Sequence, residues 1–456
     1  MDRKSARWVI ALGYRAFVLV SISFLVARVG LPMLAVSVSQ EGAPVPVAPS
    51  QTTEKAKQAP GDYQLPPDRY DKAVALSRTE YALYFVSTAW GILCILLLLQ
   101  LGIVAKLRDF AERVGRSRLV QSLIFIPGLI LLLAALHLPL SIYGHHLVLR
   151  YELSVQGWGS WFWDWTKGEL LTIALGFLVV WILFSVVRWR PRTWWLYFWI
   201  AIVPVALFIF FISPWFLDPL FNKFQPLQGT HPDLVESIGK LTERAGVPIP
   251  PERMFLMEAS AKSTEINAYV TGIGASKRVV VWDNTIQKTS PDEVLYIVGH
   301  ELGHYVLGHV WKGFLFFVVG MFFGLYVAYR LLQWTLTRWG KKWGVRGQED
   351  WAALAVLLLI MHMLEFMGMP IGNGFSRMQE HEADVYGLEV THGLIPDSSE
   401  VAARAFQVLG NVDLADPNPS KFITFWLYSH PPLGDRLNFA RNYDPWSKGQ
   451  SPQFVK

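Results

Sequence analysis

Seven long apolar stretches constrain the fold of this 456-residue chain more than any other feature. A helix needs about 20 consecutive apolar residues to cross the hydrocarbon core of a bilayer. Hydrophobic residues make up 52% of the chain and charged residues only 17%, as in membrane proteins. We therefore expect seven transmembrane helices, near residues 8–27, 81–104, 119–143, 170–188, 194–216, 311–333 and 352–370.

The first stretch follows Arg3, Lys4 and Arg7, so a cleaved signal peptide is an alternative to a retained helix. Arg15 inside the stretch and the length of the stretch favour a retained helix. The single cysteine, Cys94, excludes an intrachain disulfide. The net charge of +5 could suggest nucleic-acid binding, but the basic residues lie in short loops between the apolar stretches. We therefore expect a lipid bilayer as partner and no nucleic acid.

The chain is expected to divide into two regions. Residues 1–216 hold five of the predicted helices and a flexible solvated loop at 40–80, whose first part is rich in Pro, Ala and Gln. Residues 217–456 hold the other two helices and most of the water-soluble sequence.

Within residues 217–456, an amphipathic helix is predicted from His231 to Gly246. Three short runs rich in β-branched or aromatic residues follow, and the last two flank a turn at 272–276. They predict a small sheet from residues 254–257, 266–271 and 279–282.

The motif His300-Glu301-Leu302-Gly303-His304 comes directly after this sheet. The preceding run, Pro291 to Gly299, begins with proline and acids and continues with apolar residues, which predicts a helix. Histidines four residues apart project from one helix face and can share a Zn²⁺ ion, while Glu301 can act as a base beside it. Zinc peptidases place a sheet edge beside such a helix to hold an extended peptide.

A catalytic zinc usually has three protein ligands and one open position, so a third ligand is needed. The nearest candidate is His309. Nine residues after His300 it would point to the opposite side of a continuous helix, so we interpret it as structural.

A better candidate lies in the run from Ser376 to Asp384. Glu380 and Asp384 share a helical face, which suits one carboxylate that binds the metal and a second that orients an imidazole. His381 and Glu382 compete with Glu380 for the ligand role.

These motifs together resemble the type I CAAX prenyl proteases, which are integral-membrane zinc metalloendopeptidases. The resemblance covers nearly the whole chain. Besides the motif at 300–304 it rests on Asn267-Ala268-Tyr269, the segment 218–224, the run from Ser376 to Asp384, and residues 429–436.

The resemblance implies a mainly α polytopic membrane fold, in which a seven-helix bundle encloses a chamber and joins a small α+β zinc-peptidase domain. His362 and Glu365, in the last apolar stretch, are expected to line that chamber. It also implies one Zn²⁺ per chain, with Glu380 as its third ligand. The residues that it assigns to an oxyanion-stabilising role are His430 and Arg436, and those that it assigns to a substrate-binding edge strand are Asn267, Ala268 and Tyr269.

The expected function is hydrolysis of peptide bonds in peptides or membrane-associated proteins. One alternative is a heat-shock-type membrane quality-control protease, which shares the zinc motifs but generally has fewer membrane helices. Another is a non-enzymatic membrane protein with a structural zinc, which would not need Glu301 as a base.

The distribution of basic residues predicts the orientation in the membrane. Short loops rich in Lys and Arg stay in the cytoplasm, which places the zinc region on the other side, the periplasm of a bacterial inner membrane. The resemblance to eukaryotic enzymes implies the opposite arrangement, an endoplasmic reticulum membrane with a cytosol-facing site. The basic loop residues are Lys106, Arg108, Arg113, Arg116, Arg118, Arg188, Arg190, Arg192, Arg338, Lys341, Lys342 and Arg346.

Overall fold

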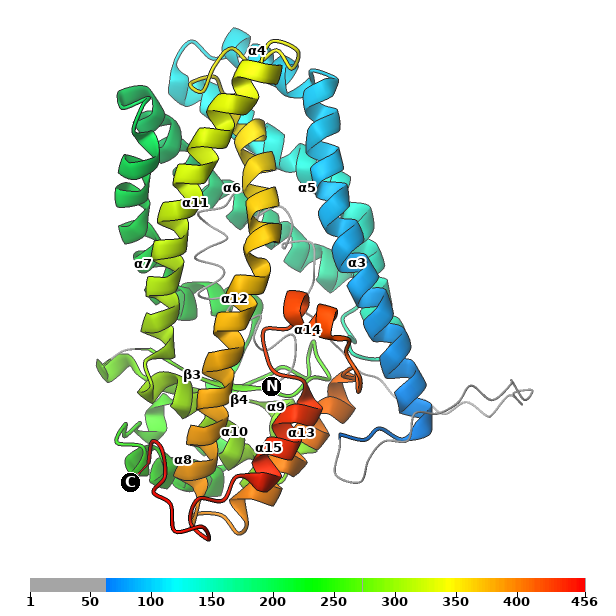
Figure 1. Ribbon diagram of the computed structural model, residues 1–456, viewed down its shortest axis with the longest axis vertical. Coiled ribbons are helices and arrows are strands. Elements are labelled where there is room, and N and C mark those ends of the chain that lie inside the picture. Colours follow the sequence, from blue (N-terminus) through cyan, green and yellow to red (C-terminus); the bar gives the residue numbers. More distant parts are fainter. Residues whose placement is uncertain (1–62, 273, 456) are drawn as a thin grey trace, which may run out of the picture.

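A computed structural model of the protein describes residues 63–272 and 274–455. It is mainly helical and elongated, with a bundle of long helices at one end and a smaller α+β region at the other (Figure 1). The predicted helix at 8–27 and the first part of the predicted loop, 40–62, lie outside the described residues.

Six helices of the described residues are long and apolar enough to cross a membrane. They confirm the second to seventh predicted membrane helices, and most extend beyond the predicted bounds. A short amphipathic helix, α4 (Ile103–Val114), connects the first two. The six are α3 (Pro67–Gln100), α5 (Arg118–Arg150), α6 (Trp158–Trp189), α7 (Trp194–Phe221), α11 (His309–Trp339) and α12 (Ala353–Thr391).

The predicted flexible loop ends earlier than expected, because α3 begins at Pro67. Proline at the first helical position and Asp68 in the first turn favour a helix start there. Just before it, Tyr63 and Leu65 are buried in the apolar core of the α+β region. The loop prediction for residues 67–80 is therefore wrong. The apolar stretch in the sequence indicated the membrane part of this helix but not its polar N-terminal extension.

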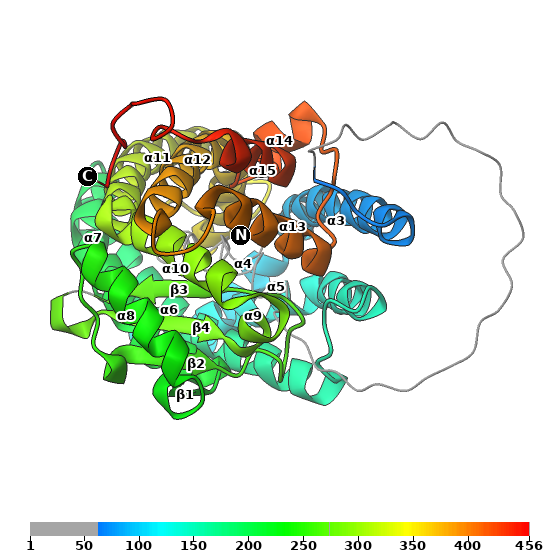
Figure 2. The ribbon, with the colours of Figure 1, turned by 90° about the horizontal axis from the view of Figure 1, so that it is seen from below.

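The α+β region contains a four-stranded sheet in the order β1-β2-β4-β3. The sequence predicted β2 (Met254–Met257), β3 (Ala268–Thr271) and β4 (Arg278–Trp282), and missed the three-residue β1 (Phe224–Pro226). Strands β3 and β4 form the expected antiparallel hairpin, whereas β2 runs parallel to β4. Strand β3 thus lies at one edge of the sheet, beside α10 (Pro291–Val306) in the view from below (Figure 2).

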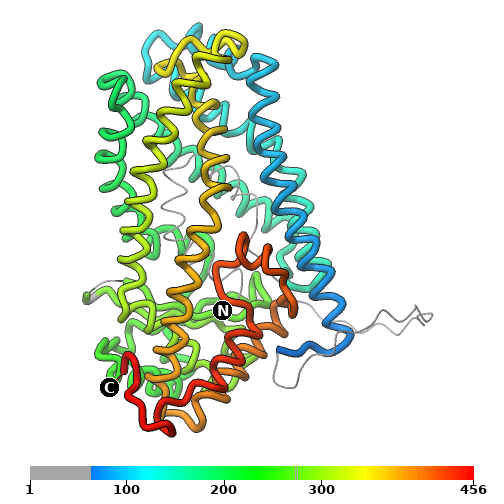
Figure 3. Tube along the Cα trace, viewed as in Figure 1, coloured from blue at the N-terminus to red at the C-terminus, as the bar shows by residue number. Residues whose placement is uncertain are grey.

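The remaining helices pack around this sheet, α10 and α12. The predicted amphipathic helix is confirmed as α8 (Pro232–Arg244), and α9 (Asp283–Lys288) joins β4 to α10. The C-terminal part adds α13 (Ser398–Asp413), α14 (Lys421–Leu427) and α15 (Leu433–Asn442). The chain then runs back past the lower end of α12 (Figure 3), where the buried carboxylate of Glu389 accepts hydrogen bonds from the backbone N–H groups of residues 453–455.

One helix, α12, belongs to both ends of the molecule. It has 39 residues, or about 58 Å at 1.5 Å per residue, which is almost twice the roughly 30 Å of a bilayer core. Pro370 lies within the helix without ending it. The last membrane helix and the polar run around Glu380 are therefore one continuous element.

His362 does not occupy the predicted place. Its side chain is 6% exposed and its Nε2 lies 3.2 Å from the carbonyl oxygen of Thr88 in α3. Its ring also lies against Gly91 of α3. His362 is therefore a buried packing contact between α12 and α3, and the prediction that it lines a chamber is wrong.

Glycines allow α10 and α12 to approach closely. A Cβ atom on Gly303 would lie 3.0 Å from the Cβ of Tyr386 and 3.2 Å from the Cα of Ala383, both on α12. A Cβ on Gly387 of α12 would lie 3.1 Å from the backbone nitrogen of His300. These contacts leave no room for a larger residue without a shift of one helix.

We predict that Gly303→Val destabilises the protein by about 1–3 kcal/mol, because overpacking forces α10 away from α12. Thermal unfolding of the purified protein in detergent measures the change. Gly239→Val is the matched control, since a Cβ on Gly239 of α8 meets nothing within 4 Å. Equal losses in both variants would contradict the close-packing argument.

Candidate metal centre

The motif residues lie on α10, whose start is fixed by its sequence. Ser290 and Glu293 form a capping box, each side chain accepting a hydrogen bond from the backbone N–H of the other residue, and Pro291 occupies the first turn. The helix then passes through the interior, so that His300 and Glu301 are each 2% exposed and His304 is 7% exposed.

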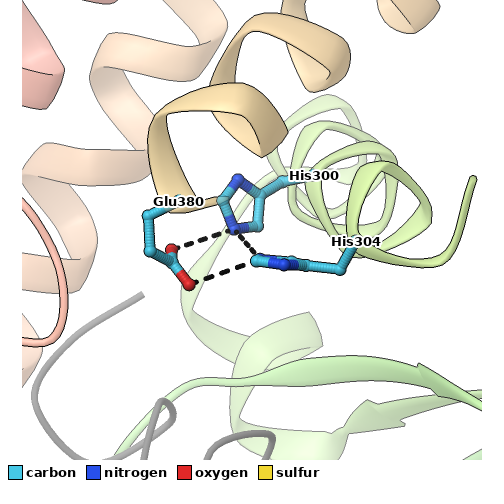
Figure 4. A group of neighbouring side chains, drawn as sticks. All are labelled: His300, His304 and Glu380. Carbon is cyan, nitrogen blue, oxygen red and sulfur yellow. Dashed lines mark hydrogen bonds and ion pairs between the residues drawn. The ribbon is translucent and has the colours of Figure 1, made fainter. Parts of the chain in front are cut away.

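Three side chains from α10 and α12 meet at one point (Figure 4). The Nε2 atoms of His300 and His304 are 3.1 Å apart. The two carboxylate oxygens of Glu380 lie 3.4 Å from Nε2 of His300 and 3.3 Å from Nε2 of His304. One ligand atom from each residue lies within 4.8 Å of the others, which forms a candidate metal site.

The donor set fits a divalent metal ion. Two metal–nitrogen bonds of about 2.0 Å at a tetrahedral angle place the nitrogens about 3.3 Å apart, close to the observed 3.1 Å between His300 and His304. In addition, Oε2 of Glu380 is buried and accepts no hydrogen bond from any described residue, with Nη2 of Arg436 3.8 Å away. A buried carboxylate oxygen without a hydrogen bond is costly, and a metal ion bound there would satisfy it.

Asp384 and Arg436 lie behind the candidate site. Oδ1 of Asp384 is 2.9 Å from Nδ1 of His300, so His300 directs its other nitrogen toward Glu380 and His304. Arg436 of α15 donates two hydrogen bonds to Asp384, of 2.8 Å from Nε and 2.5 Å from Nη2. Burial alone would lower the pKa of His300, but Asp384 and Glu380 outweigh it and raise that pKa to about 9. The site therefore favours a positive charge.

Glu301 and His430 flank the three candidate ligands. Oε1 of Glu301 is buried and accepts no hydrogen bond within the described residues; burial raises its pKa, while His300 and His304 lower it. Nε2 of His430, in the loop between α14 and α15, lies 3.1 Å from Oε1 of Glu380. The structure thus brings every predicted catalytic residue to the same place.

The predicted substrate strand is the edge strand of the sheet. Ala268 and Tyr269 belong to β3, and Asn267 comes directly before it. The Asn267 carbonyl accepts a hydrogen bond of 3.0 Å from the Trp282 N–H, and the Tyr269 hydroxyl donates one of 3.3 Å to Asp218. These hydrogen bonds join the segment to β4 and to α7.

A pocket that the sequence did not reveal opens beside His300. Its lining is mainly apolar and comes from the two residues before β3 and from α10, α13 and α15. Asn267, His300 and Arg436 of this lining were predicted as site residues, and Tyr296 and Ile297 lie one turn before His300 on the helix face of the motif. The lining residues are Ile266, Asn267, Tyr296, Ile297, His300, Ala405, Phe406, Leu409 and Arg436.

Sequence reasoning misplaced His309. Helix α10 ends at Val306, and Gly308, with φ of 69°, caps the new helix α11, which begins at His309. This break turns His309 back toward the site, where its Nδ1 lies 3.0 Å from Nδ1 of His304.

The two competitors of Glu380 point elsewhere. Glu382 pairs with His309. The ring of His381 packs against Phe439.

Long apolar helices joined to a buried cluster of two histidines and a glutamate define the chain as an integral-membrane metallopeptidase. The profile of peptidase family M48 matches residues 220–444, and the profile described as "CAAX prenyl protease N-terminal, five membrane helices" matches residues 51–223. The chain belongs to peptidase family M48, in its CAAX prenyl protease branch.

Individual relatives agree with this assignment. The Bacillus subtilis protein named uncharacterized metalloprotease YhfN is 33% identical over 85% of this chain and 88% of its own length. A CAAX prenyl protease 1 homolog of Dictyostelium discoideum is 28% identical over 72% of this chain and 75% of its own. The crystal structure of S. mikatae Ste24p, at 22% identity, has the same fold, with a TM-score of 0.74 over 96% of this chain and 99% of that one.

We predict that Glu380→Ala reduces the metal content of the purified protein from about one ion per chain to background, because three protein ligands are the usual minimum for such a site. Elemental analysis after dialysis measures this. Glu236→Ala, at an exposed ion pair on α8, should retain the metal. Full metal content in Glu380→Ala would exclude Glu380 as a ligand.

Proposed function

We propose that the protein is a zinc metalloendopeptidase, with one Zn²⁺ per chain held by His300, His304 and Glu380. The observation that carries the proposal is the buried group of two Nε2 atoms and one carboxylate, with the carboxylate of Glu301 beside it. Imidazole and carboxylate are ligands typical of catalytic zinc, in the combination of two histidines and one glutamate.

Zinc, when bound, supplies Lewis-acid polarisation of the attacking water and the scissile carbonyl. Glu301 takes a proton from that water and returns it to the leaving amine. Asp384, held by Arg436, orients His300. His430 and Arg436 stabilise the negative charge on the tetrahedral intermediate, because a hydrogen-bond donor and a fixed cation near the reacting carbonyl serve this purpose.

The substrate is proposed to bind as an extended peptide along β3, through Asn267, Ala268 and Tyr269. Its backbone would pair with β3, the strand at the edge of the sheet, as in other cases of strand addition. Peptides and membrane-associated proteins are the proposed substrates.

Two features argue against the alternative functions. A structural zinc needs no general base, yet Glu301 is buried beside the site with an oxygen that no described residue satisfies. The six described membrane helices and the CAAX prenyl protease relatives argue against a heat-shock-type quality-control protease.

We predict that Glu301→Gln lowers the rate of peptide cleavage by at least ~10²-fold, because the amide cannot act as a base. The metal content should stay near one ion per chain, because the three ligands are unchanged. Cleavage of a peptide library by the purified protein, analysed by mass spectrometry, tests the first point, and elemental analysis the second. A wild-type cleavage rate in this variant would refute the proposed mechanism.

We also propose that the metal centre lies on the periplasmic side of a bacterial inner membrane. In Figure 1, α4 and the connection between α11 and α12 lie at the end of the bundle opposite to α10, the sheet and α15. These connections carry many of the basic residues that favour the cytoplasm, including Arg113, Lys341 and Lys342.

A C-terminal fusion to an enzyme that is active only outside the cytoplasm is expected to be active in bacteria. A fluorescent protein that folds only in the cytoplasm, fused at the same place, should then remain dark. The reverse pair of results would place the site in the cytosol and would make cytosolic prenylated proteins candidate substrates.

A further inference from the structure

A second histidine and a second glutamate lie behind the candidate ligand His304. His309, the first residue of α11, is 3% exposed. Its Nδ1 lies 3.0 Å from Nδ1 of His304, and its Nε2 lies 2.8 Å from Oε2 of Glu382 on α12. Lys312 lies 3.4 Å from the same oxygen of Glu382. Three helices thus supply one linear chain of contacts that ends at a ligand.

The direction of the hydrogen bonds follows from the chemistry of the three groups. An ionised carboxylate can only accept, so Nε2–H of His309 donates to Glu382. In the neutral ring of His309, Nδ1 then carries the lone pair and accepts from Nδ1–H of His304. This leaves the lone pair of His304 on Nε2, the atom that faces His300 and Glu380.

The two histidine ligands are therefore supported in different ways. Nδ1 of His300 lies beside a carboxylate, that of Asp384, at 2.9 Å. Nδ1 of His304 reaches a carboxylate only through a second imidazole. Without His309, the buried Nδ1–H of His304 would lose this hydrogen-bond acceptor. The ring of His304 could then rotate, or bind the metal through Nδ1 instead of Nε2.

We propose that His309 and Glu382 are positioning residues that hold His304 in the tautomer and orientation required for metal binding. The proposal rests on the proposed function in one respect, since it takes His304 as a metal ligand. Groups that orient a histidine ligand in this way typically change metal affinity by about 10–100-fold when removed.

The test is the zinc dissociation constant of the purified full-length protein in detergent, measured by competition with a chromophoric chelator. His309→Phe keeps a ring of similar size but has no acceptor, and we expect about 10–100-fold weaker zinc binding. Glu382→Gln should also weaken binding, because its amide can donate to His309 and reverse the chain of hydrogen bonds. Glu382→Asp keeps a carboxylate and should restore part of the affinity.

The matched control is His381→Phe, a neighbour of Glu382 on α12 whose exposed ring contacts Phe439. Its zinc affinity should stay within about twofold of the wild type, as for a surface change with no link to the site. Thermal unfolding of each metal-free variant separates a packing defect from a defect in positioning, because positioning changes the affinity while the metal-free unfolding temperature stays constant.

The double variant decides whether Glu382 acts through His309. If it does, His309→Phe combined with Glu382→Gln binds zinc no more weakly than His309→Phe alone. Additive losses would overturn the proposal, as would wild-type affinity in Glu382→Gln. Glu382 is partly exposed. If His309→Phe fails to fold, the zinc affinity of Glu382→Gln therefore tests the proposal on its own. Failure of the proposed function itself would instead appear as no zinc binding in the wild-type protein.

Discussion

The close approach of α10 to α12 is the contact on which the metal centre depends. His300 and His304 come from a helix of the α+β region, and Glu380 comes from the lower part of a helix that begins in the membrane bundle. Gly303 and Gly387 let the two backbones approach within the reach of these side chains. The site therefore forms only when the bundle and the α+β region are assembled together, which suits proteolysis at a membrane surface.

Charge balance imposes a second constraint on the same contact. Three buried carboxylates, those of Glu301, Glu380 and Asp384, belong to this cluster, and the buried guanidinium of Arg436 pairs with two of them, Glu380 and Asp384. Burying uncompensated charge is costly, and a divalent cation between the neutral imidazoles would make the cluster neutral. The bidentate pair between Arg436 and Asp384 also ties α15 to α12, so metal binding and the packing of the C-terminal helices support each other.

Short patterns in the sequence predicted the parts of the site that lie on one element. Two histidines four residues apart, and Glu380 with Asp384 four residues apart, share helix faces whatever the tertiary structure is. His309 could not be placed in this way, because its position depends on a helix break at Gly308 that sends α11 in a new direction. The burial of His362 against α3 and the parallel pairing of β2 with β4 likewise depend on contacts between distant segments.

X-ray absorption spectroscopy at the zinc edge of the metal-loaded protein tests the central claim most directly. The account predicts a first shell of nitrogen and oxygen only, with outer-shell scattering from two imidazole rings and a fourth position open to solvent. Scattering from three or four imidazoles would contradict it, because His309 or His430 would then be a ligand and α12 would not complete the site through Glu380.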